Sequence, residues 1–183
     1  MKAESLQDLY LEQLKDLYDA ENQLMKALPK MAKAASSAEL RNAFEEHLEK
    51  TKEHAQRIET IFESMGEKAK GQKCKAMEGL VKEGSEVIEE DMADGVKDAA
   101  LIAAAQRVEH YEMAGYGCVR TYATLLGDSK AANLLEQTLQ EEEEADELLG
   151  GLAEQINVSI PQERNRSAKR TAGTPGRRTK SAA

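Results

Sequence analysis

Apolar side chains recur at steps of three and four residues along four long stretches of this 183-residue chain, which is the spacing of one face of an α-helix. The stretches cover residues 6–35, 38–65, 95–126 and 130–156. Ser36-Ser37 separates the first two, and Gly127-Asp128-Ser129 separates the last two. Because such short turns join helices that lie antiparallel and side by side, the pattern predicts two long helical hairpins.

A shorter amphipathic stretch, residues 75–91, connects the two hairpins. Only 4% of the residues are aromatic and tryptophan is absent, which disfavours β-strands. Each hairpin can bury its apolar stripes only against the other. The sequence therefore predicts an all-α fold, an antiparallel four-helix bundle of two long hairpins with a short helical crossover. Pro29 should kink the first helix and Gly66 should cap the second.

Charge divides the chain into two predicted regions, a folded bundle over residues 1–160 and a basic tail over residues 161–183. The bundle holds 18 basic and 33 acidic residues, whereas the tail holds seven basic residues and one acidic residue. The rest of the tail is mostly Ser, Thr, Ala, Gly and Pro, a composition typical of disorder. The acidic bundle argues against nucleic-acid binding by the folded part, while the tail suits contacts with nucleic acid or acidic surfaces.

Two features predict a cytoplasmic protein that does not cross a membrane. The longest apolar run, from Ala99 to Ala105, is far shorter than the roughly 20 residues that span a bilayer. The first residues also lack the apolar segment of a signal peptide. Cys74 and Cys118 belong to no CxxC motif, so we expect two buried, reduced thiols rather than a zinc site or a disulfide.

Ionisable residues interrupt the apolar stripe of every long helix. They are Glu21 on the first helix, His47 and His54 on the second, Glu109 and Glu112 on the third, and Glu142 and Asp146 on the fourth. Glu112 lies on the stripe in either of two registers for the third helix, whereas Glu109 lies on it in only one. Glu141, Glu143 and Glu144 should flank the fourth stripe outward, and Glu53 and Arg57 should pair on the outer surface.

Five of these residues share one height in the predicted bundle, namely Glu21, His54, Glu112, Glu142 and Asp146, whereas His47 lies nearer the first turn. Glu21 lies 15.5 residues before the centre of the first turn, and Glu112 and Glu142 lie 16 and 14 residues from Asp128. A carboxylate in a core is very costly unless a positive charge compensates it. Several carboxylates with one or two imidazoles suit iron or manganese. We therefore predict a dinuclear metal site that holds two iron ions, with manganese as the alternative.

The predicted metal ligands are Glu21, His54, Glu109, Glu112, Glu142 and Asp146. Glu112 is expected to bridge the two ions and to be the catalytic carboxylate. His47 lies seven residues, about 10 Å along the helix, from His54, so both histidines cannot bind one ion. We expect His54 to be the ligand and His47 to be a hydrogen-bonded histidine of the core, but the choice between them stays open.

Several separated motifs occur in a fixed order between residues 4 and 156. They are Leu17-Tyr18-Asp19-Ala20-Glu21, Cys74-Lys75-Ala76-Met77-Glu78-Gly79-Leu80, Asp98-Ala99-Ala100-Leu101-Ile102-Ala103-Ala104-Ala105-Gln106 and Val108-Glu109-His110-Tyr111-Glu112. In these motifs the chain resembles the YciF/YciE family of bacterial ferritin-like stress proteins. The resemblance implies a ferritin-like bundle, usually a homodimer, with a dinuclear metal centre of rubrerythrin type and a link to stress responses. The positions that match the family's carboxylates are Glu21, Glu109, Glu112, Glu142 and Asp146, with His54 from the second helix.

The second helix departs from the wider ferritin-like pattern, which places a Glu-x-x-His pair there. Thr51 stands three residues before His54, where the glutamate is expected. The fourth helix likewise lacks the histidine that rubrerythrins carry. The missing glutamate argues against ordinary ferroxidase chemistry. A site poor in imidazole favours manganese or weakly held iron.

Three functions are compatible with these features. In the first, the two metals react with hydrogen peroxide or dioxygen in a catalase-like or peroxidase-like way. In the second, the site sequesters metal or ties the hairpins together without turnover. In the third, the bundle is a dimeric interaction module that its basic tail recruits to DNA. Bound metal without turnover distinguishes the second function from the first, and salt-sensitive binding that needs residues 161–183 distinguishes the third.

Overall fold

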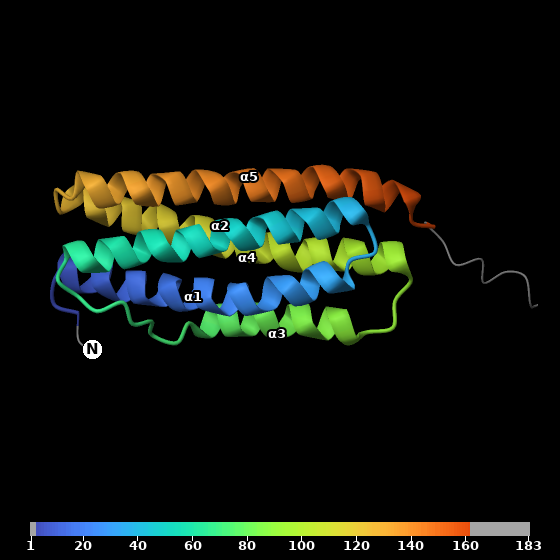
Figure 1. The fold of residues 1–183 in the computed structure, drawn as a ribbon, viewed down its shortest axis with the longest axis horizontal. Coiled ribbons are helices and arrows are strands. Elements are labelled where there is room, and N and C mark those ends of the chain that lie inside the picture. Colours follow the sequence, from blue (N-terminus) through green and yellow to red (C-terminus); the bar gives the residue numbers. More distant parts are fainter. Residues whose placement is uncertain (1–2, 162–183) are drawn as a thin grey trace, which may run out of the picture.

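The computed structural model describes residues 3–161 and contains five helices in that range (Figure 1). They are α1 (Leu6–Ala34), α2 (Ala38–Ser64), α3 (Lys75–Glu89), α4 (Asp94–Leu125) and α5 (Ser129–Ser159). Every predicted helix is present, and the expected ends differ by at most three residues. The predicted tail lies, from residue 162 onward, outside the described residues.

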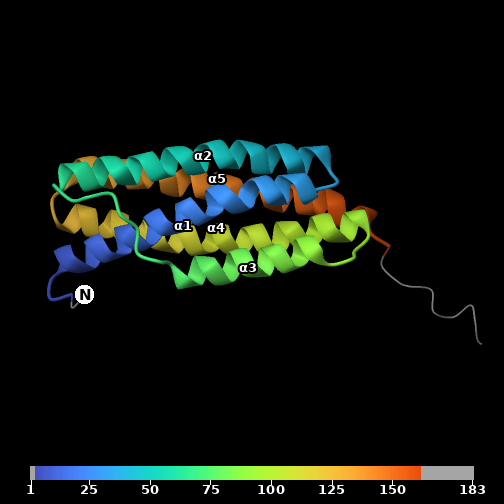
Figure 2. The same ribbon diagram turned by 60° about the horizontal axis from the view of Figure 1, so that its bottom comes forward.

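The four long helices form an antiparallel bundle in which α1 neighbours α2 and α4, while α5 neighbours α4 and α2. The turn between α1 and α2 and the turn between α4 and α5 lie at opposite ends of the bundle (Figure 1). The short helix α3 runs back along the outside of α1 and α4, as Figures 1 and 2 show. It is the predicted crossover, and it lets the second hairpin pack against the first. Within the described range, no helix is both long and apolar enough to cross a membrane.

Short polar side chains cap the N-termini of most of these helices. They accept hydrogen bonds from backbone N–H groups of the first turn, which have no carbonyl partner within the helix. Ser5 and Asp8 form a reciprocal capping box at α1, and Ser37 caps α2. Asp128 caps α5 through a hydrogen bond from the backbone N–H of Ala131. At the other ends, Gly66 and Gly127 have φ of 71° and 81°, the left-handed conformation that stops a helix.

Asp98 of α4 also links the two hairpins at one end of the bundle. Its buried carboxylate accepts hydrogen bonds from the backbone N–H groups of Ser36 and Ser37, at 2.8 and 2.9 Å. These N–H groups belong to the turn before α2, where no helical carbonyl is available to accept them. Asp98 therefore fixes the height of α4 relative to the first hairpin.

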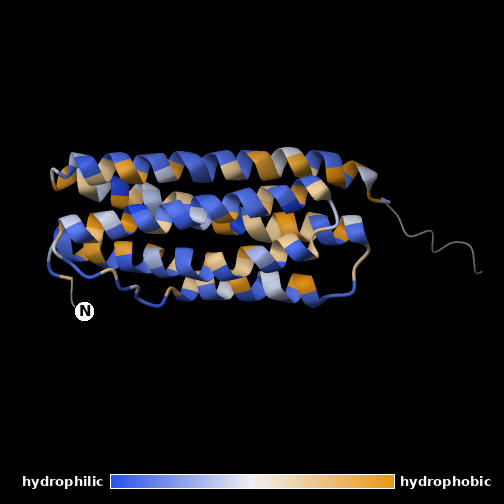
Figure 3. Ribbon diagram, in the orientation of Figure 1, coloured by the Kyte–Doolittle hydropathy of each residue, from blue (hydrophilic) through white to orange (hydrophobic). Residues whose placement is uncertain are grey.

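Two apolar clusters fill the bundle, one on each side of a polar layer. One contains Leu24, Leu28 and Leu40, together with Leu101 and Leu149. The other contains Leu14, Ile58, Phe62, Val119 and Leu135. Figure 3 shows how hydrophobic and hydrophilic residues alternate along each long helix at the spacing of helical turns. The polar layer therefore lies at mid-height, separated from both ends of the bundle by apolar core.

Candidate metal centre

The polar layer consists of side chains from all four long helices. Its acidic and imidazole members are Glu21 of α1, His47 and His54 of α2, Glu109 and Glu112 of α4, and Glu142 of α5. Glu21, His54, Glu112 and Glu142 are 0% exposed, Glu109 is 2% exposed and His47 is 9% exposed. The predicted convergence at one height is confirmed for Glu21, His54, Glu112 and Glu142, and His47 and Glu109 join them.

The donor atoms fall into two groups, and within each group they lie within 4.8 Å of one another. One group contains Glu21, His54 and Glu142, and the other contains His47, Glu109, Glu112 and Glu142. Each group offers one imidazole and two or three carboxylates. Oxygen-rich sites with a single imidazole suit iron and manganese better than zinc or copper.

Glu142 belongs to both groups, and its two oxygens face different histidines. Its Oε1 lies 3.0 Å from Nδ1 of His54, whereas its Oε2 lies 3.7 Å from Nε2 of His47. The two imidazole rings have centroids 6.4 Å apart. Glu142 therefore occupies the position between the two groups that was expected for Glu112. Glu112 itself belongs to the His47 group alone.

The layer contains more polar atoms than its hydrogen bonds satisfy. Buried atoms without a partner include both oxygens of Glu112, both of Glu142, one each of Glu21 and Glu109, Nε2 of His47 and Nδ1 of His54. Leaving a buried polar atom unpaired costs about 1–3 kcal/mol, so native proteins rarely gather so many in one place. Nearly all of these atoms are lone-pair donors that converge on two points, which is the arrangement that bound cations require. The residues present therefore fit a pair of metal ions.

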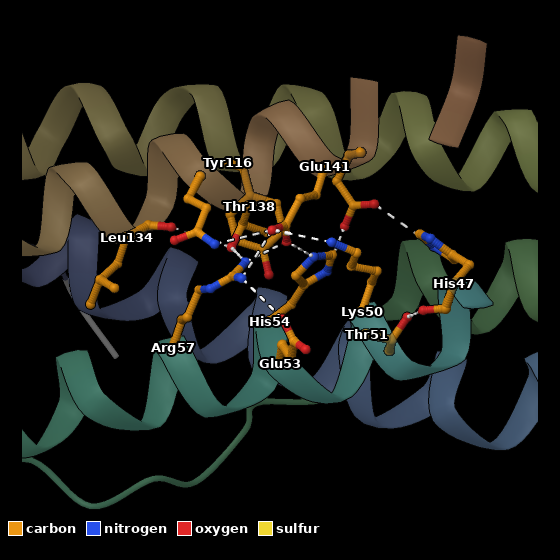
Figure 4. A network of polar contacts seen from close by, with 12 residues as sticks. His47, Lys50, Thr51, Glu53, His54, Arg57, Tyr116, Leu134, Thr138 and Glu141 are labelled. Carbon is orange, nitrogen blue, oxygen red and sulfur yellow. Dashed lines mark hydrogen bonds and ion pairs between the residues drawn. The ribbon is translucent and has the colours of Figure 1, made fainter. Parts of the chain in front are cut away.

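His54 is oriented from its outer side by a second carboxylate. Its Nε2 lies 2.9 Å from Oε2 of Glu141, and Arg57 donates a 3.0 Å hydrogen bond to the other oxygen of Glu141 (Figure 4). Arg57 also donates to Oγ1 of Thr138 at 3.1 Å, which fixes the guanidinium between α2 and α5. An imidazole that donates its Nε2 proton to a carboxylate keeps Nδ1 free as a lone-pair donor. Glu141 thus prepares His54 to bind a cation through Nδ1.

Without a cation, the acids of the layer titrate far from their ordinary range. Burial, together with the charges of Glu21 and Glu142, raises the pKa of Glu112 well above its usual value. Burial and the neighbouring Glu142 do the same to the pKa of Glu109. Burial opposes charging of His54, but its close contacts with the carboxylates of Glu142 and Glu21 outweigh it and raise the pKa of His54 to about 10. Protons therefore occupy the layer when metal is absent.

The pKa values of two glutamates on α5 move the other way. Burial opposes ionisation of Glu142, yet the imidazole of His54 at 3.0 Å and the charge of His47 lower its pKa. Burial likewise opposes ionisation of Glu141, but hydrogen bonding to Arg57 dominates and lowers the pKa of Glu141 to about 2. Both carboxylates stay charged at neutral pH, one between the two histidines and one behind His54.

Tyr116 of α4 completes the His54 side of the layer. Its hydroxyl donates a hydrogen bond to Oε1 of Glu21, and its ring centroid lies 6.3 Å from that of His54. Tyr116 is fully buried against the apolar cluster that contains Leu14 and Leu135. It therefore fixes one oxygen of Glu21 and leaves the other, Oε2, unpaired.

The structure brings five of the six predicted ligands together and leaves Asp146 apart. Asp146 lies one turn beyond Glu142, where its carboxylate accepts a hydrogen bond from Gln106 at 3.2 Å and lies 3.4 Å from His110. Its side chain is 21% exposed. Four residues turn an α-helix by about 400°, so a side chain one turn farther along drifts off the inward face.

Two expectations about neighbouring residues are wrong. Arg57 does pair with the exposed Glu53, at 3.3 Å, but Glu141 and Arg57 are not on the outer surface: both side chains are 11% exposed and pair with each other behind His54. The charge run around Glu141 conceals this role, because no pattern along α5 alone shows that Arg57 of α2 faces that position. His47, expected as a hydrogen-bonded core residue, instead presents an unpaired Nε2 to Glu109 and Glu142.

The two cysteines differ in exposure. Both thiols are free, and Cys74 is buried at the start of α3, where its sulfur lies 3.0 Å from the hydroxyl of Tyr111. Cys118 is exposed, so the expectation of two buried thiols is wrong for this residue. Cys118 lies on the outer surface of α4, six residues beyond Glu112.

Comparison with known proteins places the chain in a family. Residues 5–160 match the family described as Domain of unknown function (DUF892). Protein YciF of Escherichia coli (strain K12) is 49% identical over 154 residues, which are 84% of this chain and 93% of that protein. The chain belongs to the YciF family. The resemblance in the four sequence motifs is thereby confirmed.

Solved structures confirm the fold of the family. The crystal structure of the E. coli stress protein YciF matches with a TM-score of 0.83 and 46% identity, over 86% of this chain and 100% of that one. YcfI of Rhodopseudomonas palustris, for which a structural role has been suggested, matches with a TM-score of 0.78 and 39% identity, over 80% of this chain and 94% of that one.

A two-domain protein of Anabaena variabilis, which contains a ferritin-like domain, matches with a TM-score of 0.59 and 17% identity, over 98% of this chain and 42% of that one. At this identity the match bears on the fold alone. With the antiparallel helices and the crossover, it supports the predicted ferritin-like bundle.

Proposed function

We propose that this chain binds two iron or manganese ions in the polar layer and uses them to react with hydrogen peroxide or dioxygen during bacterial stress. The observation that carries the proposal is the set of buried, unpaired donor atoms arranged in two groups around Glu142. The relation to the E. coli stress protein YciF supports the connection to stress. When bound, iron or manganese would supply the change of oxidation state that reduction of peroxide or dioxygen requires.

The side chains have distinct tasks in this proposal. Glu21 and His54 would hold one ion, and His47, Glu109 and Glu112 would hold the other. Glu142 would serve both groups, since its oxygens face both histidines. We assign Glu112 to the side of the centre where the small substrate would react, because both of its oxygens are buried without a hydrogen-bond partner and, unlike those of Glu142, contact neither histidine as an ion pair.

The surrounding residues favour a small substrate and exclude bulk water. Apolar clusters lie on both sides of the layer, so hydrogen peroxide or dioxygen fits the available space better than a larger molecule. Glu141 holds His54 in the tautomer that offers Nδ1, and Tyr116 holds Glu21. Within the described residues Cys74 and Cys118 are free thiols that form no disulfide with each other. We therefore propose that electrons come from an external reductase.

A second candidate function is sequestration of metal, or a structural role for it, without turnover. The suggestion of a structural role for the related YcfI protein favours this alternative. A homodimer, on the pattern of the family, is compatible with both functions. The two functions differ in one measurable property, the consumption of peroxide by the metal-loaded protein.

The experiment compares two adjacent glutamates of α5. Wild type, Glu142→Gln and Glu143→Gln are loaded with Fe²⁺ without oxygen or with Mn²⁺, desalted, and analysed for metal per chain and for consumption of hydrogen peroxide. Glu143 is exposed, so its variant controls for the loss of one charge beside the site. We expect about two ions per chain in wild type and Glu143→Gln, with loss of metal and of turnover in Glu142→Gln. Metal without turnover would favour sequestration, and wild type without metal would refute the site.

A further inference from the structure

A pocket of about 160 Å³ opens between α2 and α5 and reaches one side of the polar layer. His47 and Glu109, both members of the same donor group, are part of its lining. By contrast, a pocket between α1, α3 and α4 touches none of the site's residues. The pocket between α2 and α5 therefore connects the surface to one of the two donor groups.

The two donor groups differ in how well they are sealed. Glu21, His54 and Glu142 are all 0% exposed, and the outer side of His54 is covered by Glu141 and Arg57. The side chain of His47 is 10% exposed, although its Nε2 is buried. The exposed part of the side chain therefore belongs to its other atoms, and His47 stands between the pocket and the rest of its donor group. A solute from this pocket meets His47 before it meets His54.

Charge at the pocket favours cations. Apart from the buried Glu109, its lining includes the glutamates Glu46, Glu141 and Glu144 but the single lysine Lys50. The ammonium group of Lys50 lies 3.6 Å from Oε1 of Glu141, which neutralises much of its charge. A cleft lined mainly by one sign of charge concentrates ions of the opposite sign and accelerates their binding.

We propose that this pocket is the route by which a divalent cation enters, so that the His47 group fills first and Glu142 passes an ion on to the His54 group. The inference rests on the proposed function, because it assigns an order of filling to the same two groups. Glu142 suits the transfer, since one of its oxygens lies 3.7 Å from His47 and the other 3.0 Å from His54. Among the residues that the structure describes, no other side chain contributes to both groups.

The test measures how fast Co²⁺ binds, followed by its visible absorption in a stopped-flow instrument. Ala43 lines this pocket and Ala27 lines the pocket between α1, α3 and α4, and both are 9% exposed helical residues. Ala43→Phe should slow uptake by roughly tenfold and leave the final number of ions unchanged, whereas Ala27→Phe should bind Co²⁺ at nearly the wild-type rate. Circular dichroism checks that both variants are folded.

A second pair of variants changes charge without filling the pocket. Glu46→Lys with Glu144→Lys reverses two exposed charges at the pocket, and Glu45→Lys with Glu143→Lys makes the same change in net charge at adjacent exposed positions outside it. The first pair should slow uptake by about tenfold at low salt, with the effect shrinking as salt rises, and the second pair should have a much smaller effect.

The order of filling is tested by removing one imidazole at a time. His54→Ala should bind its first Co²⁺ at the wild-type rate, whereas His47→Ala should slow the loading of both groups. The route is wrong if Ala43→Phe and the first charge pair load as fast as their controls, while wild type still binds two ions. Wild type that binds no Co²⁺ would instead overturn the proposed function, and the route with it.

Discussion

Replacing Glu112 with glutamine should stabilise the metal-free protein although it removes a residue of the centre. The folded chain keeps this carboxyl in a fully buried position, with no hydrogen-bond partner for either oxygen and with a pKa well above the usual range. In the unfolded chain the same carboxyl titrates near pH 4.3. Folding at neutral pH therefore forces Glu112 to take up a proton that the unfolded chain does not hold.

The size of this penalty follows from the pH. Each pH unit between the unfolded pKa and the experimental pH contributes about 1.4 kcal/mol, as long as the folded carboxyl stays protonated. At pH 7.5 the penalty is at most about 4 kcal/mol, the value for a folded carboxyl that is still fully protonated there. Because the pKa is raised in the folded state, this group adds stability only at low pH and loses it as the pH rises. The gain from Glu112→Gln should therefore shrink by about 1.4 kcal/mol per unit as the pH falls and vanish near pH 4.5.

The assay is urea unfolding followed by circular dichroism, at pH 5, 6 and 7.5, with a chelator present. Glu143→Gln on the exposed side of α5 is the control and should change the free energy of unfolding by less than about 0.5 kcal/mol at every pH. With Mn²⁺ in place of chelator the order should reverse, because wild type gains more from the metal than Glu112→Gln does. A Glu112→Gln variant that is no more stable than wild type at pH 7.5 without metal would refute the reasoning.

Two further predictions concern the residues around the centre. Glu141→Gln removes the carboxylate that orients His54 and deprives Arg57 of its buried carboxylate partner, so the affinity for Mn²⁺ should fall about 10- to 100-fold with the number of sites unchanged. Calorimetric titration measures this change, and an unaltered affinity would show that Glu141 has no such role. In the native protein a thiol reagent should label Cys118 rapidly and Cys74 only after unfolding. Equal and rapid labelling of both thiols would contradict the burial of Cys74.

The helices and most of the centre could be predicted because one physical rule determines both. A stripe with a period of 3.6 residues must face the core, so a carboxylate on that stripe, such as Glu21, Glu112 or Glu142, must be buried too. The positions of the turns then fix the heights of these residues along the bundle. The burial and the height of these carboxylates thus follow from the spacing of apolar residues and the positions of the turns alone.

The remaining residues depend on contacts between helices, which periodicity does not contain. His47 and His54 are about 10 Å apart along the axis of α2, but their rings lean together to a centroid distance of 6.4 Å, so both reach Glu142. Glu141 lies off the inward stripe of α5, yet it is covered because Arg57 of α2 reaches across to it. Asp146 shares the nominal stripe, yet it lies one turn nearer the end of α5 and contacts His110 instead.

The presence of two metal ions around Glu142 is tested most directly by anomalous scattering from crystals grown with Mn²⁺. We predict two peaks in the polar layer, one beside Glu21 and His54 and the other beside His47 and Glu109, with a separate oxygen of Glu142 facing each. An empty layer, or one peak that Glu142 does not contact, would contradict the dinuclear centre.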